Sequence, residues 1–512
     1  MRITNNMMIN NTSANINGNK INVNALNLQM SSQKKIQRPS ENPVVAIRAL
    51  RLRSTLSQIN QFYEKNIPDA QAWLESTETA LKNMNKILTD VKTECVNGTN
   101  SYLTEKDRET ILKNLKALKD QIYSEGNADN AGRTVFTGYK TNSQLTFMED
   151  EAKTSYTIKQ NISYKEMEEY SYYLGSVEVP SSVAEVKNTS NISDIVKYDY
   201  DRVRLAYDDV SKIEGSIVYK DGTVEGGCTW EYFDSEEDWE AAYPDKKMQG
   251  YQVVVIRDKG DVIFGDKIAD LVKSNQATIQ MEYTKTGFAK GELRPEYYYD
   301  CQDITDPAKP VTYDKYQKDQ NGNCIVDENG NYKKIYEDLN YMVSLNQTLT
   351  VNIQADEVFD MSIYQDVNEL IDTVQNAINA HEKVDRLKEM KNEAKYADCQ
   401  EEVQKWIDGA QKEADYADSR LTELFSAGIG KFDKYMEKLN VAYTEIGARG
   451  DQLEMTESRI SNLQLTQEEL KSCNEDRELS DIIIDYTAAF NAYQASLLSA
   501  SKIEKQTLLD YI

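Results

Sequence analysis

Histidine and cysteine, which often carry catalysis or bind metals, are scarce and scattered in this sequence. His381 is the only histidine among 512 residues, so a Ser-His-Asp triad would have to use it and a two-histidine zinc site is impossible. No two cysteines are close enough for the Cys-x-x-Cys motif of zinc or redox proteins. The six are Cys95, Cys228, Cys301, Cys324, Cys399 and Cys473. We interpret His381 as a surface residue and the cysteines as isolated buried thiols, and we predict no catalytic residue, metal site or cofactor.

Acidic residues are abundant, but they form no compact catalytic motif. Paired carboxylates can hydrolyse glycosidic bonds, and tryptophans often line sugar grooves. One group of acidic residues lies between Trp230 and Trp239, and it comprises Asp234, Glu236, Glu237 and Asp238. A solvated acidic loop anchored by the tryptophans is the simpler interpretation. A surface carbohydrate-binding or hydrolytic module in the middle of the chain remains an alternative.

Two segments rich in Asn and Gly resemble calcium-binding loops without meeting their requirements. An EF-hand loop needs Gly at its sixth position and Glu at its twelfth. A loop that begins at Asp319 has Cys324 and Gly330 at those positions, and one that begins at Asp327 has Tyr332 at its sixth. Both segments fit hairpin turns better, because Asn and Gly readily adopt positive φ.

The charge balance restricts the partners of the protein. The chain has 59 basic and 85 acidic residues, a net charge of −26. We therefore expect no nucleic-acid partner and no anionic membrane surface, since both attract clustered Lys and Arg. We expect no cleaved signal peptide and no membrane span, because neither the apolar core of a signal peptide nor a run of about 18 apolar residues is present. Taken alone, this pattern favours the cytoplasm.

The first 40 residues differ from the rest of the chain. They contain no Asp or Glu, and ten Asn lie between Asn5 and Asn27. Apolar residues recur there at heptad spacing, which indicates a coiled-coil seam. They are Ile9, Ile16, Val23, Leu26 and Met30. Because Asn is a poor helix former, we expect this helix to need a partner.

The C-terminal part of the chain also predicts long helices with coiled-coil seams. No proline follows Pro310, so these helices are unobstructed. The last seam alternates spacings of four and three and consists of Leu479, Ile483, Tyr486, Phe490, Tyr493, Leu497 and Ala500. The two terminal helices are natural partners, either within one chain or between subunits. Only Lys20 is charged between Ile9 and Met30, and this favours burial between subunits, since burying unpaired charge is costly.

Between the ends, the composition shifts toward Tyr, Val, Thr and Gly. We expect an α+β fold in which both termini form an elongated coiled-coil stem that carries an inserted β-rich variable domain. The expected parts are terminal segments 1–35 with 480–512, a helical stem 36–147 with 362–479, and the variable domain 148–361. A β-hairpin is expected at 133–147, and a second one around Asp258-Lys259-Gly260-Asp261.

Five stretches of sequence resemble the flagellin-like family of bacterial flagellar subunits, and within it the hook-associated protein 3 family. The chain start, Met1 to Thr4, and the chain end, Leu508 to Ile512, suit that family. The stretch Arg38 to Pro43 is similar to a family Pro-Ser-Asp-Asp-Pro motif, and Gly132 to Thr141 is the most specific match. The matching residues are Pro39, Ser40, Pro43, Gly132, Arg133, Phe136, Gly138 and Tyr139, with Gly447 and Arg449 shared near the C-terminus.

The resemblance covers roughly 1–147 and 430–512, and three stretches depart from it. Glu41-Asn42 replaces the usual acidic pair, Arg477-Glu478-Leu479 replaces an acidic, alanine-rich run, and residues 385–420 form an extra charged helical stretch. The resemblance implies a structural subunit at the hook–filament junction, with a flagellin filament subunit as the alternative.

The resemblance also implies a location and a set of partners. Such a protein leaves the cell through the flagellar type III export channel without a cleaved signal peptide, so the expected location becomes the extracellular flagellum rather than the cytoplasm. The implied partners are neighbouring copies in a ring, the other hook-associated junction protein, flagellin and an export chaperone. The terminal segments 1–35 and 480–512 are then expected to become ordered on assembly.

Overall fold

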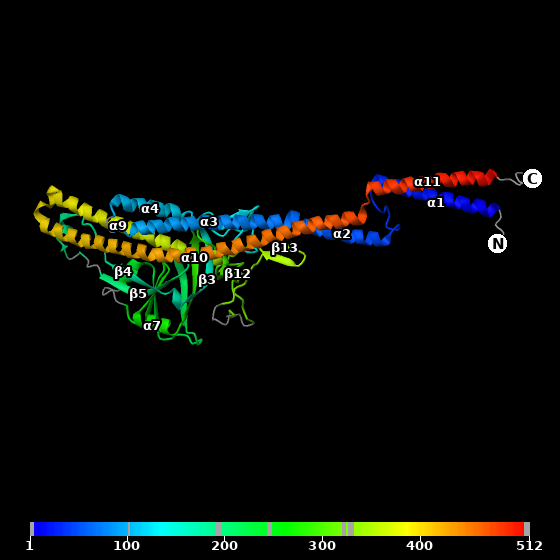
Figure 1. Cartoon of the computed structure of the whole chain (residues 1–512). Helices are drawn as coiled ribbons and strands as arrows, with labels where there is room; N and C mark the ends of the chain where they lie inside the picture. The colour runs from blue at the N-terminus through cyan, green and yellow to red at the C-terminus, as the bar shows by residue number, and fades with distance from the viewer. Residues whose placement is uncertain are drawn as a thin grey trace, which may run out of the picture. The chain divides into compact units, whose positions relative to one another are not determined.

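The computed structural model describes residues 5–100, 103–175, 177–189, 192, 196–242, 248–319, 324–325 and 332–505. Its contacts divide the chain into two units. Unit 1 comprises Met1–Gln71, Asn340–Leu349 and Gly450–Ile512, and unit 2 comprises Ala72–Leu339 and Thr350–Arg449. Long helices lie toward both ends of the sequence and strands lie in the middle, as the sequence predicts (Figure 1).

Unit 1 is mostly helical. Its helices are α1 (Asn5–Ser32), α2 (Pro43–Gln61) and α11 (Leu479–Lys505), with the C-terminal part of α10 (Gln400–Glu475). The chain continues from α2 through a π-helical turn, η1 (Phe62–Asn66), into α3 (Ile67–Gly98). The Asn42 side chain accepts a hydrogen bond from the Val45 amide at 3.2 Å and Pro43 follows at the first helical position, so these two residues cap the start of α2.

A short hairpin completes unit 1. Strands β13 (Asn340–Ser344) and β14 (Gln347–Thr350) pair with each other. The Asn66 side-chain amide donates to the Met342 carbonyl at 2.7 Å, and the Tyr341 hydroxyl to Asp69 at 2.6 Å. These bonds fix β13 against the junction of η1 and α3.

The helices of unit 2 bury apolar faces. In α3, the side chains of Trp73, Leu81, Met84, Leu88 and Val91 are buried. Helix α4 (Glu105–Lys119) begins at a capping box in which Thr104 and Asp107 bond each other's backbone amide, and it packs on α9 (Ser362–Asn392). Short helical segments connect the larger elements. They are η2 (Ser124–Asn127), η3 (Tyr164–Glu166), α5 (Val183–Val186), α6 (Glu236–Ala242), α7 (Asp266–Ser274), η5 (Pro295–Tyr297), α8 (Ala355–Val358) and η6 (Ala394–Cys399).

The middle of unit 2 contains two five-stranded sheets. In the first, the strand order is β12-β11-β3-β10-β6 and all pairs are antiparallel. In the second, the order is β4-β5-β9-β8-β7, and only β7 and β8 are parallel. The strands are β3 (Glu151–Ser163), β4 (Glu168–Leu174), β5 (Val196–Arg204), β6 (Val210–Val218), β7 (Thr229–Phe233), β8 (Gln252–Ile256), β9 (Asp261–Phe264), β10 (Thr278–Phe288), β11 (Asp300–Asp303) and β12 (Val311–Tyr313).

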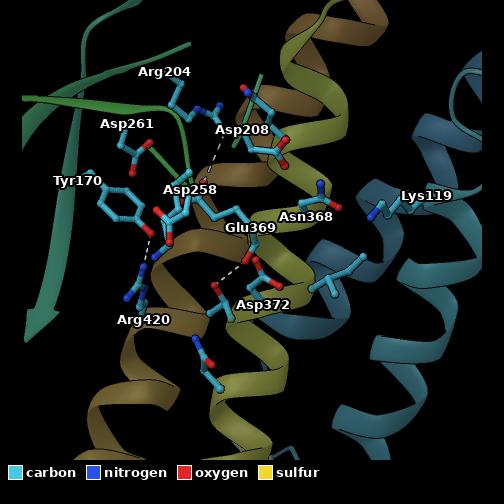
Figure 2. A pocket seen from close by; sticks show the side chains of 15 residues that line it. Lys119, Tyr170, Arg204, Asp208, Asp258, Asp261, Asn368, Glu369, Asp372 and Arg420 are labelled. Atoms are coloured by element: carbon cyan, nitrogen blue, oxygen red, sulfur yellow. Dashed lines mark hydrogen bonds and ion pairs between the residues drawn. The ribbon is translucent and has the colours of Figure 1, made fainter. Parts of the chain in front are cut away.

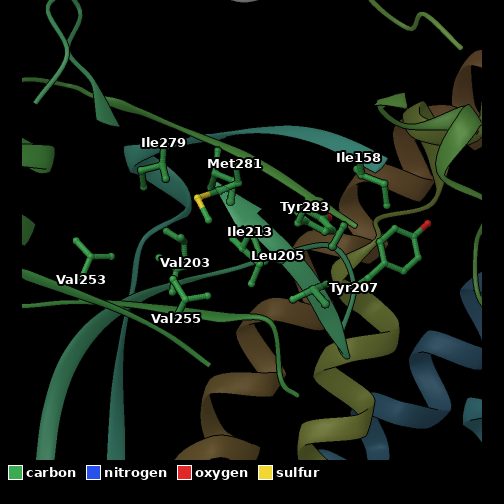
Figure 3. Close-up of a cluster of buried hydrophobic side chains, with 14 of the residues drawn as sticks. Ile158, Val203, Leu205, Tyr207, Ile213, Val253, Val255, Ile279, Met281 and Tyr283 are labelled. Atoms are coloured by element: carbon green, nitrogen blue, oxygen red, sulfur yellow. The ribbon is translucent and has the colours of Figure 1, made fainter. Parts of the chain in front are cut away.

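One hydrophobic core joins the two sheets. It combines Ile158, Ile279 and Tyr283 from the first sheet with Val203 and Val255 from the second (Figure 3). Strand β8 is buried along its whole length, which explains its continuous Gln-Val-Val-Val-Ile sequence rather than an alternating one. On the other side of the second sheet, a smaller aromatic cluster gathers around Trp239, which is fully buried.

The first predicted hairpin lies elsewhere in the structure, while the second is confirmed. Strand β1 (Asp129–Asn130) pairs with β2 (Arg133–Thr134), and residues 135–147 form turns. The two residues between the strands, Ala131 and Gly132, have φ values of 52° and 80°, as a tight two-residue hairpin turn requires. In the second hairpin, Gly260 (φ 68°) lies in the turn between β8 and β9. The calcium-like loops fall largely on residues 320–323 and 326–331, outside the described residues.

Buried charges attach the second sheet to the helices. The Arg202 guanidinium, only 3% exposed, lies 3.1 Å from Asp261 and 2.8 Å from Glu369 of α9, and its centre lies 3.4 Å from the Tyr170 ring. Lys431 of α10 joins the network, 2.7 Å from Glu168. Burial disfavours ionisation of Glu168, but Arg204, Arg202 and Lys431 outweigh it and lower its pKa to about 2. Each buried ion thus has partners of opposite charge from another element.

A polar cavity of about 330 Å³ lies beside this network. Figure 2 shows Tyr170, Arg204 and Asp261 from the sheet facing Glu369 of α9 and Arg420 of α10. Its other wall residues include Lys119, Asp258 and Asp372, and burial raises the pKa of both of these aspartates.

We predict that Arg202→Met destabilises unit 2 by about 3–5 kcal/mol, because it leaves buried carboxylates without their counter-charge. Lys159→Met is the matched control, since its side chain is 63% exposed and lies 3.2 Å from Glu282 in an exposed pair. The control should cost less than about 1 kcal/mol. Urea unfolding followed by tryptophan fluorescence reports unit 2 alone, because all four tryptophans lie in it. Equal costs for the two variants would contradict this role of the buried network.

The stability of unit 2 should also depend on pH through Glu292. Burial raises the pKa of this carboxyl to about 7, Asp208 and Asp209 add to the rise, and Lys285 opposes it. The folded state therefore holds a proton that the unfolded chain has lost, and stability falls as pH increases from about 4.5 to 7. Glu292→Gln should abolish this fall and raise stability at pH 8 by up to about 3 kcal/mol. The unfolding midpoint of the parent and that of Glu292→Gln are compared at pH 5 and at pH 8. If both midpoints change by the same amount between these pH values, the assignment to Glu292 is refuted.

Candidate assembly interface

Helices α1 and α11 lie side by side and antiparallel (Figure 1). Six half-buried residues of α1 follow one another at spacings of four and three: Thr12, Ile16, Asn19, Val23, Leu26 and Met30, and Gln29 and Ser32 are also half-buried at the end of the helix. The less exposed residues of α11 follow the same rhythm: Ile482, Tyr486, Ala489, Tyr493, Ser496 and Ala500. This is the spacing of a coiled-coil seam, and it includes small residues on α11. We call these two sets the inner seam.

The structure separates the predicted terminal seams into residues of the inner seam and residues that are exposed. Ile16, Val23, Leu26 and Met30 belong to the inner seam, whereas Ile9 is exposed at the start of α1. On α11, Tyr486, Tyr493 and Ala500 belong to it. The exposed residues of the predicted C-terminal seam are Leu479, Ile483, Phe490 and Leu497. Ile482 is completely buried and was not part of the predicted seam.

Each terminal helix has a second apolar stripe. On α1, exposed apolar residues recur every seven positions: Met7, Ala14, Ile21 and Leu28. Ile21 is 69% exposed although it is a large aliphatic residue. On α11, Ile483, Phe490 and Leu497 also recur every seven positions, and the rings of Tyr486 and Phe490 stack with centroids 6.0 Å apart. We call these two sets the outer stripes. Large exposed apolar side chains in such a row make these stripes candidates for an interaction surface.

Two breaks in the helices meet at one end of the α1–α11 pair. The first break follows α1 and the second separates α10 from α11. The Lys35 amide donates to the Glu475 carbonyl at 2.7 Å, and the Arg477 amide to the Gln33 carbonyl at 3.0 Å. The Arg477 side chain also reaches Gln29 at 3.1 Å, so this departure from the family pattern has a structural role. We call this arrangement the clasp.

A buried carboxylate holds the clasp to α2. Glu475 is 5% exposed, and Arg53 donates to it through two nitrogens at 2.7 and 2.6 Å. Lys34 lies 3.6 Å from the same carboxylate and also pairs with Asp476. The hydrogen bond from Arg53 is the main reason that the pKa of Glu475 is lowered. A contact through two nitrogens pairs the charges of the two side chains and also fixes their relative orientation.

The first group of family-motif residues lies between α1 and α2. Pro39, Ser40 and Pro43 are exposed, and the stretch forms a turn in which the Glu41 amide donates to the Arg38 carbonyl at 3.0 Å. The Glu41 carboxylate accepts from the Gln37 amide at 2.8 Å. This departure from the family motif therefore stabilises the turn.

The other motif residues lie in unit 2. Arg133 is placed over the Trp73 ring at 5.1 Å, and the buried Phe136 meets Phe359 edge-on with centroids 5.1 Å apart. Gly138 has φ 62°, and a Cβ there would collide with Glu337, so the turn requires glycine. The neighbouring Tyr139 amide donates to Glu337 at 3.0 Å. Gly447 is half-buried on α10, where Arg449 donates to the Asn352 carbonyl at 2.6 Å.

The residues with catalytic or metal-binding potential have structural partners. His381 is half-buried rather than on the surface, and its Nε2 lies 2.9 Å from Asp418, which also pairs with Arg108. The acidic group pairs with nearby bases, Asp234 with Arg257 and Glu236 with Lys259. Cys95, Cys301 and Cys399 are buried, Cys228 and Cys324 are half-buried, and Cys473 is exposed. Within the described ranges, no three His, Cys, Asp or Glu side chains converge as metal ligands. None of the described helices is both long and apolar enough to cross a membrane.

The N-terminal part of the chain is similar to known flagellar proteins. Residues 3–141 match the bacterial flagellin N-terminal helical region, which confirms the predicted resemblance for that part. The chain is 28% identical over 143 residues to flagellar hook-associated protein 3 of Salmonella typhimurium, covering 28% of this chain and 44% of that protein. The same protein of Escherichia coli is 28% identical over 127 residues, and the match covers 24% of this chain and 39% of that protein. The chain thus spans less than half the length of either curated relative.

Solved structures show a weaker likeness over more of the chain. One from Vibrio parahaemolyticus, described provisionally as a flagellar hook-associated protein, has a TM-score of 0.36 at 14% identity and covers 85% of this chain and 99% of that one. Flagellar hook-associated protein-3 of Legionella pneumophila has a TM-score of 0.29 at 11% identity, and the match covers 82% of this chain and 96% of that one. Scores of this size carry no argument about function.

We predict that Glu475→Gln loosens the clasp. The amide keeps the shape of the carboxylate but loses its charge, so the contacts with Arg53 and Lys34 weaken by about 1–3 kcal/mol. Hydrogen exchange should then become faster at the Lys35 and Arg477 amides, whose acceptors lie in the clasp. Glu478→Gln, an exposed neighbour, is the control and should leave both amides unchanged. Unchanged protection in Glu475→Gln would show that the backbone bonds alone hold the breaks together.

Proposed function

We propose that this chain is a structural subunit of the bacterial flagellum that forms the junction between hook and filament. The match of residues 3–141 to the flagellin N-terminal region supports a flagellar subunit. Both curated relatives are named flagellar hook-associated protein 3, which favours the junction over a flagellin filament subunit. The proposal describes a non-enzymatic protein, and the ion pairs of the acidic group near Trp239 agree with it.

The outer stripes carry this proposal. A pair of helices needs only one seam, yet α1 and α11 each have a second apolar stripe that is exposed in the single chain. Fully burying an exposed apolar side chain contributes about 1.5–3 kcal/mol, and Ile21, which is 69% exposed, can still gain most of this in a complex. Between Ile9 and Met30 only Lys20 is charged, so α1 can be buried at a small desolvation cost. Neighbouring copies present the same stripes and are the proposed occupants.

The location and the partners follow from this role. The subunit would be exported to the outside of the cell without a cleaved signal peptide and would join a ring of identical copies. The other hook-associated junction protein and flagellin would adjoin the ring, and an export chaperone would bind the chain beforehand. That segments 1–35 and 480–512 become ordered only on assembly stays a prediction. In the single chain, α1 and α11 are already helical and paired.

Substitutions on the two sides of α11 separate folding from assembly. Phe490 is 38% exposed and stacks on Tyr486, so Phe490→Asp should lower the monomer's unfolding midpoint far less than substitution of a fully buried residue while it places a charge in the subunit interface. Ile482 is fully buried, so Ile482→Asp should instead detach α11 from α1 in the monomer, because an unpaired buried charge costs several kcal/mol. Helix loss by circular dichroism and hydrogen exchange in α1 would report this detachment.

The decisive readout is filament assembly by cells that express Phe490→Asp. These cells should export the protein and shed flagellin into the medium, because the junction cannot form. Asn491→Asp is the matched control, since it adds the same charge at the adjacent exposed position outside the stripe. Normal filaments on Phe490→Asp cells would overturn the proposed role of the outer stripes.

A further inference from the structure

We propose that Lys285 and Asp208 condense into an amide bond that covalently links strand β10 to the loop before β6. Lys285 is buried in unit 2, and its ammonium lies 2.8 Å from the Asp208 carboxylate and 2.9 Å from the Asp208 carbonyl oxygen. These two contacts hold the lysine against a single residue. The carboxyl carbon lies one bond beyond the contacted carboxylate oxygen, close to the near-attack distance of about 3–3.5 Å.

The backbone keeps the two reacting groups in place. Lys285 pairs with Tyr156 of β3 on one side and with Val210 of β6 on the other, so it lies inside the first sheet. Asp208 precedes Val210 by two residues. Because both groups are held by the same strand pairing, they react with a high effective concentration. The unfolded chain does not hold them together, so the bond forms only after unit 2 has folded.

A buried carboxyl group beside the pair can carry the protons of this reaction. Glu292 is 7% exposed, and its carboxylate accepts a hydrogen bond from the Ala289 amide at 3.0 Å. Burial raises the pKa of Glu292 to about 7 against the opposing charge of Lys285, and the charge of Asp208 adds to the rise. Part of the molecules therefore keep this proton at neutral pH, as a proton carrier requires.

A small cavity adjoins the two carboxyl groups. It measures about 20 Å³, and both Asp208 and Glu292 line it. This volume holds about one water molecule, which is the leaving group of the condensation. Tyr123, Tyr207 and Tyr364 also line the cavity, and a pair that is largely withdrawn from water gains when its charges are removed. The Asp208 side chain is 43% exposed, so the released water can reach the solvent.

The condensation balances without any further reactant. A proton first moves from the Lys285 ammonium to the Asp208 carboxylate, which leaves a neutral amine and a carboxylic acid. The amine nitrogen then bonds to the carboxyl carbon, and Glu292 donates its proton to the departing hydroxyl group. The carbon–oxygen bond breaks, one water leaves, and Glu292 takes a proton from the new amide nitrogen. Glu292 therefore ends as it began, and no atom is oxidised or reduced.

A second buried pair in unit 2 serves as an internal comparison. Lys315 lies 2.9 Å from Asp356, but Lys334 pairs with the same carboxylate. Burial opposes ionisation of Asp356, and the two lysines outweigh it and lower its pKa. An ionised carboxylate does not accept attack by an amine, so this pair should remain unlinked.

The test follows the intact mass of the full chain as it refolds from urea. The parent should keep its full sequence mass in urea and lose one water molecule after refolding at neutral pH. Protease digestion should then give a branched peptide that joins the segments around Lys285 and Asp208, while the segments around Lys315 and Asp356 stay separate. A refolded parent that keeps its full mass would overturn the proposal.

Three variants identify the reacting groups. Lys285→Arg keeps the positive charge and should lose no water. Glu292→Gln should slow the loss by about 100-fold or more, because it removes the proton carrier. Asp209→Asn, at the exposed neighbouring position, is the control and should lose water like the parent.

Two results of the variants would count against the proposal. Water loss that persists in Lys285→Arg would overturn it, because the water would then come from another part of the chain. Linkage of Glu292→Gln at the rate of the parent would overturn the role of Glu292. If Lys285→Arg does not fold, the branched peptide decides, and its absence from a parent that has lost water overturns the proposal.

Discussion

A helix that is apolar on two sides cannot bury both against a single neighbouring helix. Helices α1 and α11 are under this constraint. Their inner seam is covered by mutual contact, and their outer stripes are left in water. The scarcity of charge in α1 follows from the same constraint, since an unpaired charge on either side would oppose burial. The terminal helices therefore cover their inner seam by pairing with each other, and their outer stripes are not covered within the single chain.

Unit 2 satisfies its polar groups in a different way. Its sheets are held to α9 and α10 by ions that are buried and paired across elements, with Arg202 and Glu369 at the centre. The partners lie far apart in the sequence, so the attachment exists only when both parts are folded. In unit 2, the positions of opposite charges determine which elements pack together. In the terminal pair, the spacing of apolar residues does. The two sheets and the helices that carry these ions belong to the same unit 2.

The sequence predicted the features that depend on local spacing. Heptad repeats identified both terminal helices. Spacing did not reveal which side of α11 faces α1. Its inner seam includes the small residues Ala489 and Ser496, which let the helices approach closely, while the larger Ile483, Phe490 and Leu497 are exposed. The first hairpin was misplaced because its turn consists of Ala131 and Gly132, a weaker signal than the Thr- and aromatic-rich stretch after it. The network around Arg202 was not predictable, since no local pattern links β5 to α9.

The clasp limits which insertions and deletions the two helix breaks can accept during evolution. Lys34 and Asp476 are 442 positions apart in the sequence, yet they form an antiparallel β-bridge. The bridge requires that the segment between α1 and α2 and the segment between α10 and α11 keep their lengths. A residue inserted into one break would shift its partner atoms by about 3.3 Å and mismatch the other break. Insertions and deletions at the two breaks are therefore tolerated only in compensating pairs, and the lengths of these distant segments should be inherited together.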